Sequence, residues 1–205
     1  MKKISLLFVI FVLFACQPSN VKKQLIELGA IPSDHTSEYL EVYKKVSVTQ
    51  KIYSEFETKA IITVTPFTIE FLNAYLNERR LFLRETDFST LEARERQINS
   101  KNLKFFVSFY TPNPDFNDLD KPNSIWQIFI EKSDATKILP LATRKSTETY
   151  PVLNHFFPSL DPWSSPYLII FPRFNNDVSN LQNGEEFKLV FKSVLGTSTF
   201  IFKNL

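Results

Sequence analysis

The chain has 205 residues, 24 basic and 22 acidic, with a formal net charge of +2 at pH 7 and a single cysteine. Its length suits one domain with an appendage, and a hydrophobic content of 43% is enough for a core. One cysteine excludes a disulfide within the chain and a site built from several thiolates. The nearly balanced charge opposes nucleic acid as a partner, because that binding depends on clustered lysine and arginine.

The first fifteen residues have the pattern of an export signal. Lys2 and Lys3 form a basic start, and residues 4–15 are apolar except for Ser5. This run is shorter than the roughly 20 apolar residues that a membrane-spanning helix needs, so residues 1–15 are predicted to be a signal peptide. Its removal leaves 22 basic and 22 acidic residues, which lowers the formal net charge to about zero.

The end of this segment reads Leu13, Phe14, Ala15, Cys16. An ordinary cleavage site has small residues at both the third and the first position before the cut, and here the third position is the bulky Leu13. The four residues resemble the lipobox of bacterial lipoproteins. The resemblance implies that Cys16 receives a diacylglycerol, that the chain is cut before it, and that its new amine is acylated. Two or three acyl chains anchor a protein stably. The alternative is an ordinary signal peptide followed by a chance cysteine.

The same resemblance implies a location in the cell. In many Gram-negative lipoproteins an aspartate after the cysteine retains the protein in the inner membrane, whereas here Gln17 follows, which favours the outer membrane. Residues 16–45 are then expected to hold the lipidated N-terminus and a tether, and residues 46–205 an extracytoplasmic domain.

Helical spacing occurs in two regions. Residues 36–45 predict a short helix capped by Thr36 or Ser37. Thr65 and Pro66 predict the start of a long helix. Its apolar stripe is Phe67, Phe71, Tyr75 and Phe82, and its expected solvent side is Glu78, Arg79, Arg80 and Arg84. A capping box at residues 89–92 favours a break or kink and a second helix from Ser89 to Ser100, over one helix of more than 30 residues.

The remaining pattern is that of strands. Residues 46–64 predict a hairpin with its turn near 55–59, and residues 103–109 alternate with Leu103, Phe105, Val107 and Phe109 on one face. Further strands are predicted at 124–131, 137–141 and 166–171, with a turn at Asn183 and Gly184 and a final hairpin around Gly196. The fold class predicted is α+β: an antiparallel immunoglobulin-like β-sandwich over 101–205, preceded over 46–100 by a hairpin and one long or kinked helix. The earlier strands could also join the same sheets.

Motifs for chemistry are sparse. His35 lies in the predicted tether and His155 has no carboxylate beside it in the sequence; HExxH, GxSxG and SxxK are absent. Asp115 to Asp120 match a calcium loop only in part, so solvated loop carboxylates are expected there. No metal site and no cofactor are predicted.

Residues 150–172 are rich in aromatics and proline. Phe156, Phe157, Trp163 and Tyr167 are the candidate binding residues, since a rigid aromatic surface could stack on a sugar or receive a peptide. The structural interpretation, which we favour, is that this segment connects two strands and that its aromatic side chains close the end of the sandwich.

These patterns do not specify an activity. They favour a membrane-anchored, non-catalytic binding or scaffold module with an envelope protein as partner. One alternative is a small-ligand or glycan binder that uses residues 150–172. Another is an envelope hydrolase, which His155 within hydrogen-bond reach of a serine or carboxylate in a cleft would support.

Overall fold

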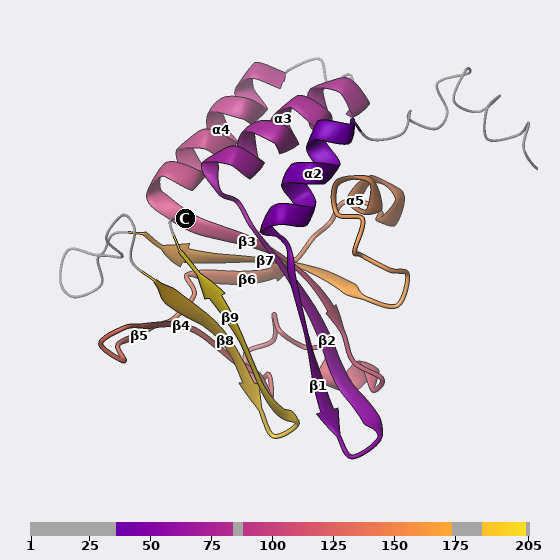
Figure 1. Ribbon diagram of the computed structural model, residues 1–205, viewed down its shortest axis with the longest axis vertical. Helices are drawn as coiled ribbons and strands as arrows, with labels where there is room; N and C mark the ends of the chain where they lie inside the picture. Colours follow the sequence, from indigo (N-terminus) through magenta and orange to yellow (C-terminus); the bar gives the residue numbers. More distant parts are fainter. Residues whose placement is uncertain (1–35, 84–87, 174–185, 204–205) are drawn as a thin grey trace, which may run out of the picture. The chain divides into compact units, whose positions relative to one another are not determined.

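Antiparallel strands form two sheets in the computed structural model, which describes residues 36–83, 88–173 and 186–203. Within these residues one sheet has the order β1-β2-β3-β7-β6 and the other β5-β4-β8-β9 (Figure 1). The first sheet is made of β1 Val48–Ser54, β2 Glu57–Pro66, β3 Asn102–Tyr110, β7 Ser165–Pro172 and β6 Ala142–Lys145. The second is made of β5 Lys137–Ile138, β4 Gln127–Lys132, β8 Phe187–Ser193 and β9 Gly196–Phe202. The α+β class is confirmed, and the early strands join the first sheet.

The core of the sandwich lies between the two sheets and follows the alternation of β3. Leu103, Phe105, Val107 and Phe109 all point into it, as predicted. The Phe105 ring meets those of Phe171 from β7 and Phe202 from β9 at centroid distances of 5.9 and 5.7 Å. Burying such rings supplies most of the hydrophobic stabilisation that holds one sheet on the other.

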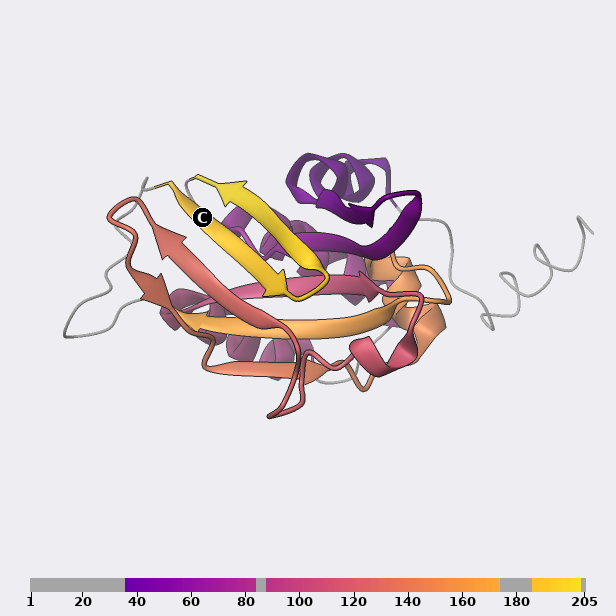
Figure 2. The same cartoon turned by 90° about the horizontal axis from the view of Figure 1, so that it is seen from below.

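Helices cover the opposite face of the first sheet (Figures 1 and 2). They are α2 Ser37–Val46, α3 Ile69–Leu83, α4 Phe88–Lys101 and α5 Tyr150–Phe156. A second apolar cluster joins them to the sheet through Phe106 of β3, which is the neighbour of Phe105 and therefore faces the other way. Strand β3 is thus buried on both faces, and the described unit has three layers: helices, first sheet, second sheet.

The two sheets come together along both sides. On one side residues 139–141 carry the chain from β5 directly into β6. On the other side β1 lies next to β9, where a Cβ added to Gly196 would be 2.6 Å from Cγ2 of Ile52. Gly196 also has φ +138, a backbone conformation that residues with a side chain rarely adopt. Both the close approach to Ile52 and this φ therefore require glycine here.

Several local predictions are confirmed. Helix α2 begins after Thr36, whose hydroxyl oxygen accepts from the Tyr39 N–H at 3.3 Å. The β1–β2 hairpin turns at Glu55 and Phe56. The β8–β9 hairpin turns just before Gly196.

The predicted helix start at Thr65 and Pro66 is wrong. Strand β2 runs through Pro66, because its residues stay paired with β3 and Phe67 N–H still donates to the Lys104 carbonyl at 2.9 Å. Helix α3 begins three residues later, and the Thr68 hydroxyl accepts from the Phe71 N–H at 3.0 Å. Pairing in the sheet overrides the local capping signal.

The second helix is confirmed as a separate element. Helices α3 and α4 run antiparallel, because Arg80 bonds Glu92 at 3.2 Å while Arg96 bonds Asn73 at 2.8 Å. A single helix of more than 30 residues is therefore excluded.

Three short elements were not predicted: β6, α5 and the 3-10 helix η1 Pro114–Phe116. Helix α5 begins after Thr149 with a proline in its first turn, a start signal that the aromatic composition of the segment obscured. Other predictions lie outside the described residues: the signal peptide, Cys16, the tether as far as His35, and the turn at residues 183–184.

Candidate functional site

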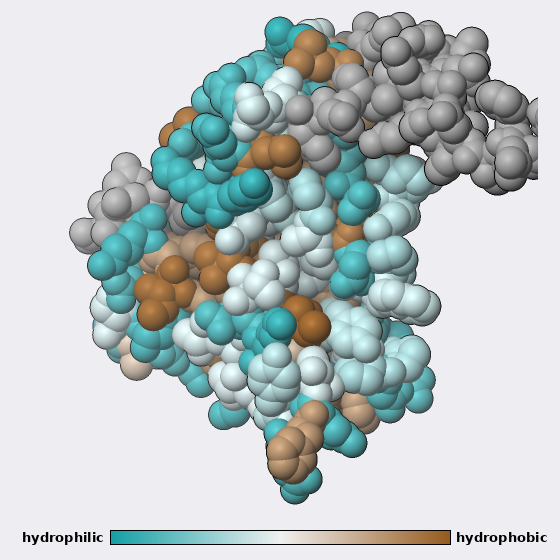
Figure 3. All heavy atoms as spheres, turned by 45° about the vertical axis from the view of Figure 1, so that its right-hand side comes forward, coloured by the Kyte–Doolittle hydropathy of each residue, from teal (hydrophilic) through white to brown (hydrophobic). Residues whose placement is uncertain are grey.

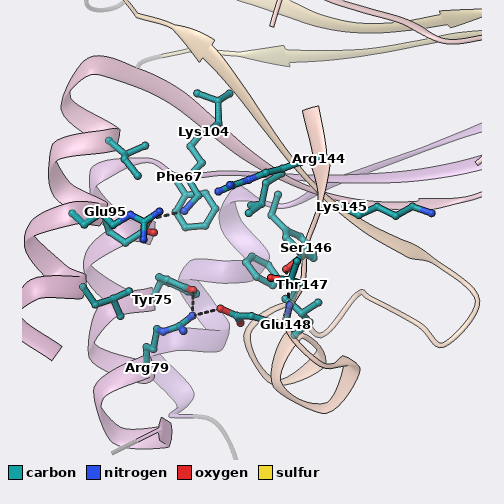
Figure 4. Close-up of a pocket in the computed structure, with 18 residues that line it drawn as sticks. Phe67, Tyr75, Arg79, Glu95, Lys104, Arg144, Lys145, Ser146, Thr147 and Glu148 are labelled. Carbon is teal, nitrogen blue, oxygen red and sulfur yellow. Dashed lines mark hydrogen bonds and ion pairs between the residues drawn. The ribbon is translucent and has the colours of Figure 1, made fainter. Parts of the chain in front are cut away.

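A cavity of about 300 Å³ lies between the helical layer and the first sheet (Figure 4). Its walls come from α3, α4, β3, β7, β6, α5 and the segment before α5, which include parts that are distant in the sequence. Its apolar lining is Phe67, Tyr75, Leu91, Ile98, Phe106, Leu153, Phe157, Leu168 and Ile170. The volume is at the small end of the range for ligand sites.

The charged lining of this cavity is mostly basic. The cations are Arg79, Arg94, Lys104, Arg144 and Lys145, and the carboxylates are Glu95 and Glu148. None of these seven side chains was a candidate in the sequence, because each belongs to an ordinary polar position of its own helix, strand or loop. Only the packing of the helices on the sheet brings them to one cavity.

Lys104 of β3 is one of the charged residues that line the cavity. Its Nζ donates to Glu95 Oε2 at 2.6 Å and lies 4.2 Å from the centre of the Phe67 ring. The side chain is only 8% exposed, and burial lowers the pKa of Lys104, against which Glu95 acts. Lys104 is therefore held by a carboxylate and an aromatic face inside the wall of the cavity.

Arg79 is held in a similar way by α3 and the segment before α5. Its Nη1 donates to the Tyr75 hydroxyl at 2.7 Å and to Glu148 Oε1 at 2.8 Å (Figure 4). Burial raises the pKa of Tyr75 above its ordinary value, so this hydroxyl stays neutral. The positive charge of Arg79 is thus already balanced by Glu148.

Arg94 and Arg144 differ from these two cations. Both side chains are exposed, and within the described part of the chain neither makes an ion pair or a hydrogen bond. Arg144 points toward Lys104 and Phe67 in Figure 4, and its charge helps to lower the pKa of Lys104. Lys145, from the next position of β6, points away from the centre of the cavity (Figure 4).

A second polar cluster is buried between α2, α3 and α5. His155 Nε2–H donates to Glu78 Oε1 at 2.9 Å, and Glu78 Oε2 accepts from the Thr36 hydroxyl at 2.9 Å. The His155 ring stacks on Phe82 at 3.7 Å, and the Glu78 and His155 side chains are 4% and 10% exposed. Neither residue lines the cavity.

This cluster corrects the prediction about the solvent side of the long helix. Glu78 was expected on that side, but it is buried against His155, which has no carboxylate beside it in the sequence. The signal was present in the spacing, since positions 71, 75, 78 and 82 fall on one helical stripe. Arg79 was also predicted to lie on the solvent side of the helix, but its side chain is only 11% exposed.

The four candidate aromatic residues are not on one surface. Phe156 and Phe157 are buried in the cluster under the helices, and Tyr167 is buried in the sandwich, where its hydroxyl donates to Asn117 Oδ1 at 2.7 Å. Trp163 is 80% exposed. Three of the four therefore act as core side chains, and Phe157 alone also lines the cavity.

The acidic loop at residues 115–120 is tied to the fold. Asp118 is buried and accepts from the Ser124 hydroxyl at 2.9 Å and the Ile125 N–H at 3.3 Å, so it is not the solvated carboxylate that was expected. In the ranges that the structure describes, no group of three or more His, Cys, Asp or Glu side chains could hold a metal ion.

Exposed large apolar side chains come from separate segments. Phe56 and Val194 lie at hairpin turns, Leu139 and Leu141 lie between β5 and β6, and Trp163 follows α5. On the face in Figure 3, hydrophobic residues form separate groups among hydrophilic ones. In the part of the chain that the structure describes, the basic cavity is therefore the feature that most resembles a binding site.

No helix among the described residues combines the length and the apolar character needed to cross a membrane. Comparison with known protein families, with curated proteins and with solved structures found no match.

Proposed function

We propose that this chain is a lipid-anchored envelope protein whose globular unit is a non-catalytic binding module, and that the basic cavity is its ligand site. The observation that carries the site is the pair Arg94 and Arg144, two guanidinium groups that line one cavity and have no ion-pair or hydrogen-bond partner among the described residues. Exposed arginines beside apolar walls are suited to bind a ligand, since charge and apolar area then act together.

The non-catalytic part of the proposal is supported by the position of His155. A hydrolase needs its base in a cleft beside a nucleophile. His155 instead is buried against Glu78 and Phe82, and it does not line the cavity. Ser146 and Thr147 do line the cavity, but no histidine is among the lining residues.

The anchor, the outer membrane and an envelope protein partner belong to the same proposal and rest on residues 13–17. We also propose the immunoglobulin-like class for the sandwich, supported by two antiparallel sheets around one core. A glycan site along residues 150–172 is less favoured, because only Trp163 of the four candidate aromatic residues is exposed.

Replacing Cys16 with alanine is expected to abolish metabolic labelling with palmitate and to move the protein from the membrane fraction to the soluble fraction. The reason is that Cys16 is the only thiol available for the diacylglycerol. Labelling and fractionation of cells expressing each form measure this. Unchanged labelling and membrane retention would refute the anchor.

Replacing Leu91 with tryptophan is expected to remove a bound small molecule from the protein. Leu91 lines the cavity from α4, and a larger ring there fills part of its volume. The full chain is extracted from its own membranes in a mild detergent, and the small molecules that it carries are measured by mass spectrometry.

The matched control is Ala93→Trp, which adds the same ring to an exposed position of the same helix. The wild-type chain and this control should carry the ligand, and Leu91→Trp at least about tenfold less. The ligand site is refuted if no form carries a small molecule above background, or if all three carry equal amounts.

A further inference from the structure

Resting on the proposed ligand site, we infer that the ligand is a phosphate monoester with a small apolar body. The phosphate group is bound between Arg94 on α4 and Arg144 on β6, and the body lies against the apolar wall of the same cavity. The inference follows from three features: the charge left unbalanced, the number of donors, and the lining.

The unbalanced charge of the cavity amounts to two guanidinium groups. Glu95 and Glu148 are each bonded to a cation already, Lys104 at 2.6 Å and Arg79 at 2.8 Å. Arg94 and Arg144 have no such partner among the described residues, and Lys145 points away. A ligand with two negative charges is therefore matched to the site, whereas a monocarboxylate leaves one guanidinium unbalanced.

The donors of two arginines also favour a phosphate over a carboxylate. Each guanidinium presents a planar fork that binds two acceptor oxygens at once. A carboxylate has two oxygens, which one fork occupies. A phosphate monoester has three terminal oxygens in a tetrahedral arrangement, so it accepts from forks on opposite walls, and Arg94 and Arg144 come from opposite walls of the cavity.

The lining requires an organic body on the phosphate. The partly exposed part of the apolar lining is Leu91 and Ile98 of α4 together with Leu168 and Ile170 of β7, and Leu168 is the strand partner of Arg144. Inorganic phosphate would leave these side chains in contact with water, whereas an aromatic or aliphatic body covers them. A volume of about 300 Å³ limits this body to a small one.

A polymeric anion is a poorer match. Arg94 and Arg144 line one cavity of limited volume, and the chain without residues 1–15 has a formal net charge of about zero. Binding to nucleic acid needs many lysine and arginine contacts along a backbone.

The test uses titration calorimetry on the full lipidated chain in a non-ionic detergent, in buffer without phosphate or sulfate. Four probes separate the contributions: phenyl phosphate has both parts, inorganic phosphate has no body, benzoate has one charge, and benzyl alcohol has none. Phenyl phosphate should bind at least about tenfold more tightly than each of the other three.

Arg94→Gln and Arg144→Gln should each weaken phenyl phosphate binding by about tenfold or more, since each removes one fork. The control is Arg80→Gln, which removes the same charge from an exposed position of α3 outside the cavity and should leave the affinity unchanged. Both test arginines are exposed and make no ion pair or hydrogen bond within the described ranges, so the fold should persist, which thermal unfolding checks.

Vesicles distinguish a lipid headgroup from a free phosphate monoester. The full chain with Cys16→Ala is floated with phosphatidylcholine vesicles that contain or lack phosphatidic acid. Binding that needs phosphatidic acid and is lost in Arg144→Gln supports the same chemistry with a lipid as the source. Phenyl phosphate binding without vesicle binding supports a soluble ligand.

The inference is overturned if benzyl alcohol or benzoate binds as tightly as phenyl phosphate, or if the two arginine variants behave like Arg80→Gln. It is also overturned if no probe binds while the extracted chain still carries a molecule that Leu91→Trp lacks. In those cases the proposed ligand site stands. If no extracted form carries a small molecule, or if all three forms carry equal amounts, the proposed ligand site fails and this inference fails with it.

Discussion

Replacing Phe157 with alanine is expected to lower the free energy of unfolding by about 3–5 kcal/mol, the range for large aromatic side chains lost from a core. Phe157 is 2% exposed and stacks on Phe106 of β3 at 3.5 Å. Its ring also lies 6.3 Å from Phe67 and Phe71, so it fills the space where α5, α3 and the first sheet meet. Alanine would leave a void there and loosen α5 from the sheet.

The matched control is Trp163→Ala, six positions away in the chain. Trp163 is 80% exposed, so its removal should change the free energy of unfolding by less than about 0.5 kcal/mol. Urea unfolding of the full chain, followed by circular dichroism, measures both variants. A Phe157→Ala chain as stable as the wild type, or a Trp163→Ala chain that fails to fold, would contradict the placement of these rings.

Replacing Glu78 with alanine is expected to lower the free energy of unfolding by about 3 kcal/mol. The carboxylate accepts hydrogen bonds from His155 at 2.9 Å and from the Thr36 hydroxyl at 2.9 Å, in an interior where Glu78 is 4% exposed. Its removal leaves the His155 ring, whose side chain is only 10% exposed, without this acceptor, and losing the acceptor of an enclosed donor costs more than the bond itself contributes. Because these partners lie at the start of α2 and in α5, both elements should loosen.

Glu70→Ala is the control for this variant. Glu70 is on the same helix and also forms an ion pair, with Lys45 at 2.9 Å, but it is about half exposed. Exposed ion pairs contribute at most about 1 kcal/mol, so this variant should unfold close to the wild-type urea concentration. Equal losses from both variants would show that Glu78 contributes no more than a surface glutamate. Hydrogen exchange should locate the loss from Glu78→Ala in α2 and α5.

Where a prediction depended on neighbours along the chain, the sequence was a good guide. The alternation from Leu103 to Phe109 identified β3 and its core face, because a strand places every second side chain on one side. Thr36 identified the start of α2, and the spacing around Gly196 identified the last hairpin. Each of these features is settled by interactions within a few residues.

Predictions failed where a distant element decided the outcome. Thr65 and Pro66 have the local chemistry of a helix start, but pairing with β3 keeps them in a strand. Glu78 was predicted to face solvent, but it bonds His155 of α5, which lies 77 positions later in the chain. A charged side chain on the apolar stripe of a helix either reaches solvent or is buried against a polar partner. The sequence around it does not show which, because the partner can come from a distant segment.

The sequence by itself determined the α+β class, most of the strands and the resemblance at Leu13 to Cys16. Only the tertiary structure decided the candidate site. Arg94 and Arg144 are 50 positions apart and unremarkable in their own helix and strand. They line one cavity because β6 pairs with β7 beside β3, while α4 lies over that sheet. The order of strands in a sheet depends on contacts between distant segments, and these are settled only when the whole chain packs.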